Sequence, residues 1–79
     1  MEKMPSKIIN GYKFQFYSAD RGEPAHIHVV KAEKRAKIWL NDLNVEWSRH
    51  FSPREINQII SILQEHQESL LEWYNEFFS

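Results

Sequence analysis

The chain contains no cysteine, so disulfide bonds and thiolate metal sites are excluded, and histidine and carboxylate side chains remain as metal ligands. It also has no apolar run long enough for a signal peptide or a membrane span. Both absences are compatible with a reducing compartment. We therefore expect a cytoplasmic protein that does not enter a membrane.

Net charge is also small, because 10 basic and 11 acidic residues leave −1. The two parts of the chain nevertheless differ in sign. Residues 1–50 hold nine Lys or Arg and six Asp or Glu, a net charge of +3, whereas residues 51–79 hold one and five, a net charge of −4. Either basic strands pack beside an acidic helix, or the basic side chains gather in space and meet phosphate, which would favour nucleic-acid binding.

The chain is short but rich in aromatic residues. Its 79 residues are expected to form a single domain, residues 1–79, with a small core. Three Trp, three Tyr and five Phe offset the shortage of length, because each buries a large area. Most of these rings should therefore lie in the core.

Two β-hairpins are predicted in the first half of the chain. The first joins residues 6–9 to residues 12–17, because Asn10-Gly11 tolerates the positive φ of a two-residue turn. The second joins residues 25–31 to residues 35–40, where apolar and polar residues alternate with the period of a half-buried strand. Residues 45–47 are a candidate for a short fifth strand. The residues expected on the core face are Tyr12, Phe14, Phe16, Ile27, Val29, Ala36, Ile38 and Leu40.

A long helix is predicted from Pro53 onward. Ser52 is a suitable N-cap, and Glu55 three residues later completes a capping box. A straight helix over residues 53–78 would be about 39 Å long, so it either bends near residues 65–67 or overhangs the sheet. The predicted fold is α+β, with a small antiparallel sheet of about four strands followed by a long, kinked or overhanging C-terminal helix. An overhanging end would expose a partner-binding patch of Leu70, Trp73, Tyr74 and Phe77.

The pair His26 and His28 is the feature of the sequence that most strongly suggests a chemical function. Two residues apart on a strand, they project to the same face, close enough to share one metal ion or one phosphate. Because the ordinary pKa of histidine is about 6.5, one ring could act as base and the other as acid near neutral pH. In this nuclease or phosphotransfer hypothesis Arg21 binds phosphate, and Asp20 or Glu23 orients an imidazole. These five residues are the candidate catalytic set.

Three alternatives to catalysis stay open. A divalent metal ion could be held by His26, His28 and His50, with Asp20, Glu23 or Glu46 as further donors. The histidines could equally have a structural or partner-binding role. Trp39 and Trp47 could present a flat surface for a nucleobase beside basic side chains, unless they pack in the core or hairpin. The basic residues in question are Lys13, Lys31, Lys34, Arg35 and Lys37.

Residues 11–20 (GYKFQFYSAD) and residues 23–29 (EPAHIHV), together with Ala36-Lys37-Ile38-Trp39 and Leu70-Leu71-Glu72-Trp73, are similar to a known pattern. The chain resembles the small bacterial and phage proteins grouped as domain of unknown function 4160. The signature of that family corresponds here to Asp20, Pro24, His26, His28 and Val29. The resemblance implies a partner protein encoded by a neighbouring gene, as in toxin–antitoxin pairs, and an RNA-directed activity.

The leading hypothesis from the sequence is therefore a small cytoplasmic component of a toxin–antitoxin-like two-gene module. It would act by protein–protein binding through the apolar helix end, as a homo-oligomer or in complex with the product of the neighbouring gene. A histidine-based nuclease or phosphotransfer enzyme and a metal-binding protein are the alternatives.

Overall fold

The computed structural model describes residues 6–17 and 22–78 of the 79-residue chain. These residues form a five-stranded antiparallel sheet and one long C-terminal helix, which confirms the α+β prediction. The strands lie in the sheet in their order along the chain. They are β1 Ser6–Ile9, β2 Tyr12–Gln15, β3 His26–Lys31, β4 Lys34–Trp39 and β5 Val45–Arg49, and they are followed by α1 Pro53–Phe78.

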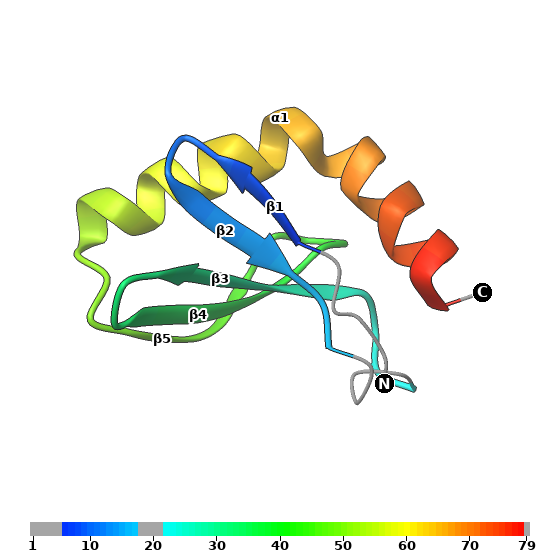
Figure 1. Ribbon diagram of the computed structural model, residues 1–79, viewed down its shortest axis with the longest axis horizontal. Helices are drawn as coiled ribbons and strands as arrows, with labels where there is room; N and C mark the ends of the chain where they lie inside the picture. Colours follow the sequence, from blue (N-terminus) through cyan, green and yellow to red (C-terminus); the bar gives the residue numbers. More distant parts are fainter. Residues whose placement is uncertain (1–5, 18–21, 79) are drawn as a thin grey trace.

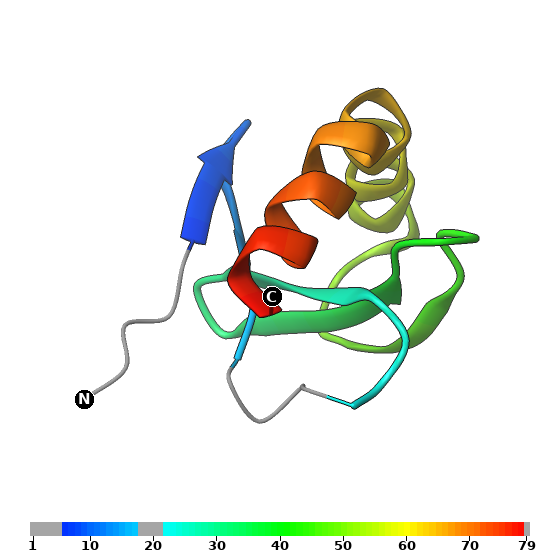
Figure 2. The ribbon, with the colours of Figure 1, turned by 90° about the vertical axis from the view of Figure 1, so that its right-hand side faces the viewer.

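Helix α1 covers one face of the sheet (Figure 1). Seen along the molecule in Figure 2, α1 lies above β3 and β4, while β1 and β2 rise along its side. The opposite face of the sheet has no helix over it within residues 6–17 and 22–78. We call this second surface the open face.

The predicted alternation decides which side chains reach the helix. Tyr12, Phe14 and Phe16 are each at most 2% exposed, whereas Lys13 between them is exposed. Burial of such large aromatic side chains supplies much of the apolar area that stabilises a chain of this length. All eight strand residues predicted for the core face are buried, and they pack with Phe51, Ile59, Ile62, Leu63, Leu70 and Tyr74.

The first hairpin turns as its sequence requires. Asn10 and Gly11 have φ values of 54° and 83°. Two successive residues with positive φ are the mark of a type I′ turn, whose twist matches that of the strands it joins. The turn fixes the register in which Ile9 pairs with Tyr12 and Lys7 with Phe14, and so sets Phe14 toward the core.

The sheet has five strands rather than about four, because the candidate strand near residue 45 is real and extends to Arg49. Its pairing with β4 shifts register between Lys37, which pairs with Trp47, and Ile38, which pairs with Val45. Glu46 is thus an extra residue in β5, a β-bulge. Bulges interrupt the strict alternation of side chains, which is why this strand is the hardest to recognise from its sequence.

The start of α1 has the predicted capping box. The Glu55 backbone N–H donates to Ser52 Oγ at 3.1 Å, and the Ser52 backbone N–H donates to Glu55 Oε1 at 2.9 Å. Each bond satisfies a backbone donor that would otherwise lack a helical partner. The boundary of α1 is therefore fixed by side chains next to it in sequence.

The far end of α1 does not overhang. The helix arches over the sheet (Figure 1), and its last turns pack around Phe16, whose ring centroid lies 4.4 Å from that of Trp73 and 5.2 Å from that of Tyr74. Leu70 and Tyr74 are buried, at 1% and 7% exposure, and Phe77 is half-buried. The described part of the chain holds no helix with the length and apolar character of a membrane span.

Candidate functional site

Strand register builds the open face in rows. One row runs across four strands, because Gln15 pairs with His28, His28 with Lys37, and Lys37 with Trp47. The neighbouring row consists of Lys13, Val30, Arg35 and Arg49. Residues directly opposite each other in an antiparallel sheet project to the same side, so both rows lie on the side away from the core.

Aromatic rings occupy the middle of the open face. The His28 ring is half-buried and lies 4.5 Å from the Tyr17 ring, edge to face, and 6.4 Å from the Trp47 ring. Trp47 is 39% exposed, which is unusual for so large an apolar side chain. Trp39 is half-buried and lies in a third row of the open face, opposite His26. These rings are tilted against one another, by 70° between Tyr17 and His28 and 53° between His28 and Trp47, and Trp47 is the accessible ring of the cluster, next to basic side chains.

His26 is not part of that accessible surface. It is 0% exposed, and its ring lies 5.5 Å from Trp39 and 6.5 Å from Tyr74. His26 Nδ1 is 2.9 Å from the Pro24 carbonyl oxygen. Because a carbonyl only accepts, Nδ1 carries the proton and donates. His26 therefore holds the entry to β3 in place.

Three successive carbonyl groups before β3 each accept a hydrogen bond from a different part of the chain. The Tyr74 hydroxyl of α1 donates to the Glu23 carbonyl at 3.3 Å. His26 donates to the Pro24 carbonyl, and the Leu40 backbone N–H donates to the Ala25 carbonyl at 2.9 Å. Pro24, whose φ is fixed by its ring, adds rigidity. This anchoring gives a structural role to Pro24 and His26, two of the residues on which the family resemblance rests.

Two carboxylates, those of Glu23 and Glu46, contact side chains of the open face. Glu23 Oε1 pairs with Lys37 Nζ at 3.0 Å, whereas it is 3.7 Å from His26 Nδ1. The Pro24 carbonyl, rather than Glu23, therefore orients the buried imidazole. Glu46, turned to this side by the bulge, accepts a hydrogen bond from Trp39 Nε1 at 3.0 Å. Both carboxylates thus hold a cation or a ring of the open face in position.

Basic residues divide between the two faces. Lys13, Arg35 and Arg49 are exposed on the open face, and Lys37 lies beside Trp39 with its Nζ 4.9 Å from the ring centroid. The other basic residues considered for a nucleobase surface lie on the helix side instead. Lys34 pairs with Glu55 at 2.6 Å and Lys31 Nζ lies 4.8 Å above the Tyr12 ring.

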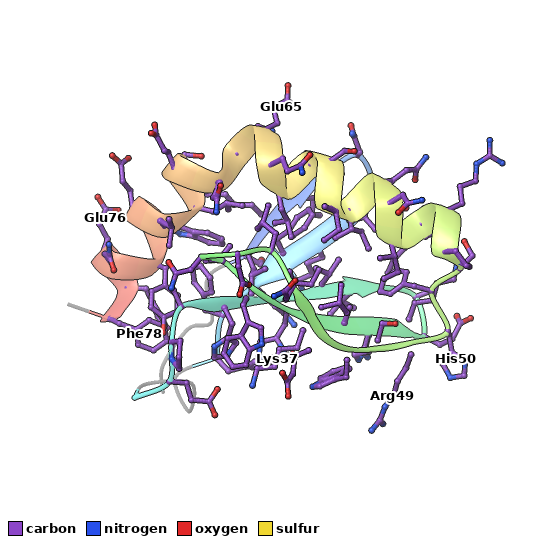
Figure 3. The ribbon with its side chains drawn as sticks, turned by 180° about the vertical axis from the view of Figure 1, so that it is seen from behind. Lys37, Arg49, His50, Glu65, Glu76 and Phe78 are labelled. Atoms are coloured by element: carbon purple, nitrogen blue, oxygen red, sulfur yellow. The ribbon has the colours of Figure 1, made fainter. Side chains whose placement is uncertain are left out.

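The exposed acidic residues of α1 lie on the other side of the molecule from the open face. In Figure 3, Lys37 and Arg49 project below the sheet, whereas Glu65 and Glu76 project from the outer surface of α1. Glu65, Glu68, Glu72 and Glu76 are all exposed along the helix. These four carboxylates are therefore separated in space from the cations Lys13, Arg35 and Arg49, so a polyanion would meet attractive charges on the open face rather than on the outer surface of α1.

The remaining candidates for chemistry that the structure describes do not converge on one site. Asp20 and Arg21 lie outside the described residues. His50 lies beyond Arg49 near the start of α1 (Figure 3). His26 instead contacts Tyr74 near the end of α1. Among residues 6–17 and 22–78, no three His, Asp or Glu side chains are placed to hold a metal ion. The acid–base hypothesis likewise finds one accessible imidazole, His28, rather than two.

Tyr17, Gln15 and Arg49 also lie on the open face. The nucleobase surface predicted from the sequence contained Trp39 and Trp47 but none of these three residues. The signal for Tyr17 was present, because it continues the polar side of the alternation begun by Lys13. Arg49 could be placed only after the bulge at Glu46 was known, since the bulge resets which residues of β5 face outward.

The sequence profile of the family described as "Domain of unknown function (DUF4160)" matches residues 11–75. The chain belongs to this family. The match confirms the resemblance drawn from the segment containing Pro24, His26 and His28. No curated protein and no solved structure matches the chain. Membership of the DUF4160 family carries no activity with it.

Proposed function

We propose that this DUF4160 protein works by binding, and that its open face binds single-stranded nucleic acid. The observation that supports this most is the combination of exposed Trp47 with the exposed cations Lys13, Arg35 and Arg49 on one uncovered sheet face. Unpaired bases stack on aromatic side chains presented by a sheet, and cations beside them attract the phosphates.

In this proposal, the bases and the phosphates of the nucleic acid contact different rows of the open face. Bases stack on the row that contains His28 and Trp47, where the rings lie. Phosphates run along the neighbouring row of Lys13, Arg35 and Arg49. Adjacent strands of a sheet are about 4.8 Å apart and successive same-face residues about 7 Å apart, so a base and its phosphate can reach the two rows at once.

This function fits a two-gene module of the kind that the family resemblance suggested. The chain would contribute nucleic-acid binding, and the neighbouring-gene protein would be its partner. The helix end offers that partner less surface than the sequence suggested, because Leu70 and Tyr74 are buried. Trp73 and Phe77 are half-buried and keep part of their rings accessible, so they remain the residues of α1 to test for partner binding.

Fluorescence anisotropy with labelled single strands of about 12 nucleotides, a length within the usual site size, tests the proposal. Trp47→Ala should weaken binding about 5- to 150-fold, the loss expected for one stacked base. Val45→Ala is the matched control, because Val45 is also on β5 and 38% exposed but pairs with the core residue Ile38. RNA and DNA strands are compared, together with a duplex that should bind more weakly.

Two results would contradict the proposal. The first is a wild-type protein that binds neither RNA nor DNA single strands at low salt. The second is equal affinity in the wild-type, Trp47→Ala and Val45→Ala proteins, which would mean that binding occurs elsewhere.

A further inference from the structure

Strand β5 is an edge of the sheet, paired with β4 on one side only among the strands of the described chain. All five of its residues are exposed, including Val45 at 38% and Trp47 at 39%. Ser48 is exposed although it pairs with the buried Ala36 and therefore projects to the helix side. Helix α1 thus leaves this edge uncovered.

Edge strands that stay single are usually guarded by charged side chains, above all lysine, by proline or by a bulge. β5 has neither proline nor lysine, and its charged residues are Glu46 and Arg49. Its bulge lies at Glu46, toward one end, and leaves Trp47, Ser48 and Arg49 in regular pairing with β4. Because backbone groups alternate in direction along an antiparallel strand, those of Trp47 and Arg49 face β4, whereas the N–H and C=O of Ser48 face outward and are a template for a further strand.

We propose that β5 pairs with β5 of a second copy, antiparallel and about a two-fold axis at Ser48. This register makes the edge complementary to itself. Trp47 and Arg49 both project to the open face, and within one chain the Arg49 guanidinium already lies 5.5 Å from the Trp47 ring centroid. Across the axis each Trp47 would face the partner copy's arginine, which forms the same type of contact twice.

Other registers fit less well. An axis at Trp47 would place Ser48, on the helix side, opposite the bulged Glu46, which is turned to the open face by its bond with Trp39. Directly opposite residues must project to the same side, so that register conflicts with the pleat. In the register at Ser48, Glu46 meets His50 only beyond the end of β5, where His50 has a φ of 71°, so the regular pairing is confined to residues 47–49.

Pairing in this way joins the two sheets into one and places the two open faces side by side. The inference does not rest on nucleic-acid binding, because it follows from the edge alone. A regular stretch of three residues per copy predicts a weak dimer, whose population increases with protein concentration.

Sedimentation velocity over a concentration series, without nucleic acid, tests the proposal. Ser48 faces its own copy across the axis, so Ser48→Lys and Ser48→Glu should each give a monomer by like-charge repulsion. An equimolar mixture of the two variants should restore the dimer, because opposite charges then meet. Ser48→Thr is the control and should associate like the wild type.

A wild-type protein that stays monomeric throughout the series would overturn the proposal. So would dimers of Ser48→Lys alone, or a mixture of the two charged variants that remains monomeric. Circular dichroism verifies that the variants fold. The nucleic-acid proposal is tested separately, because a folded monomeric Ser48→Lys protein retains Trp47 and the basic row and should still bind single strands.

Discussion

The two faces of the sheet are made by the same strands but differ in what covers them. On the helix side the strand residues form a dry core in which Phe14, Phe16 and Val29 are 0% exposed. On the open face the same strands present cations and a Trp47 ring that is 39% exposed. The difference indicates that one face stabilises the fold, whereas the other can change without unfolding it and is available for binding.

The largest expected effect concerns Phe16, the residue around which the end of α1 packs. Phe16→Ala should lower the free energy of unfolding by about 3–5 kcal/mol, because it removes a fully buried ring and leaves a cavity. Trp47→Ala removes a larger ring from the open face and should cost less than half as much. Urea denaturation measures both. Similar losses would mean that the two faces contribute equally to stability.

A closer comparison uses two valines next to each other on β3. Val29 is 0% exposed toward the helix, whereas Val30 is half-buried on the open face. Val29→Ala should cost roughly 2–3 kcal/mol, from two buried methyl groups and the cavity that they leave. Val30→Ala should cost under about 1 kcal/mol. An equal cost at both positions would show that the open face is covered in solution.

The smallest effect is a pH dependence at the helix side. The hydrogen bond from Lys34, followed by that from the Ser52 backbone, holds the pKa of Glu55 below its ordinary value of 4.5. A lowered folded-state pKa stabilises the protein above pH 4.5, and this stabilisation is lost as the pH falls through the folded-state pKa. Glu55→Gln should therefore destabilise most near neutral pH and progressively less in acid.

Thermal denaturation at several pH values measures this difference. Glu68→Gln is the control, because Glu68 is exposed farther along α1 and should show no such trend. A Glu55→Gln difference that is constant from neutral pH to acid would argue against the ion pair. The effect should be small, since pairs near the surface are screened by water.

The parts of the fold that could be predicted from sequence depend on neighbours in the chain. Asn10-Gly11 sets its turn and Ser52 with Glu55 sets the helix start, so both were found. The bulge at Glu46 and the packing of α1 on Phe16 depend on residues far apart in sequence. The strand count and the position of the helix end therefore could not be fixed beforehand.

The same limit applies to the candidate site. Alternation placed His26 and His28 on one face, but only the tertiary structure shows that Trp39 and Tyr74 approach His26 and that its exposure is 0%. The histidine pair thus divides into an anchor for the strand entry and a half-buried ring on the open face. The basic residues likewise lie on both faces of the sheet. Strand register decides which face each one occupies, and composition carries no information on register.

The most direct test of the open face as the nucleic-acid surface compares two charge reversals. Arg49→Glu lies on the open face, and Arg54→Glu lies in the first turn of α1, in a pocket shared with Asn57 and Gln58. Both variants change net charge equally. Affinity for a labelled single strand is measured at several salt concentrations between about 50 and 200 mM.

We expect Arg49→Glu to weaken binding and to make the slope of log affinity against log salt shallower by about 0.7, the contribution of one phosphate contact to a single strand. Arg54→Glu should keep the slope and affinity close to those of the wild type. Equal losses in the two variants would mean that only net charge matters, and a loss confined to Arg54→Glu would place the nucleic-acid surface on the helix; either result would contradict the account.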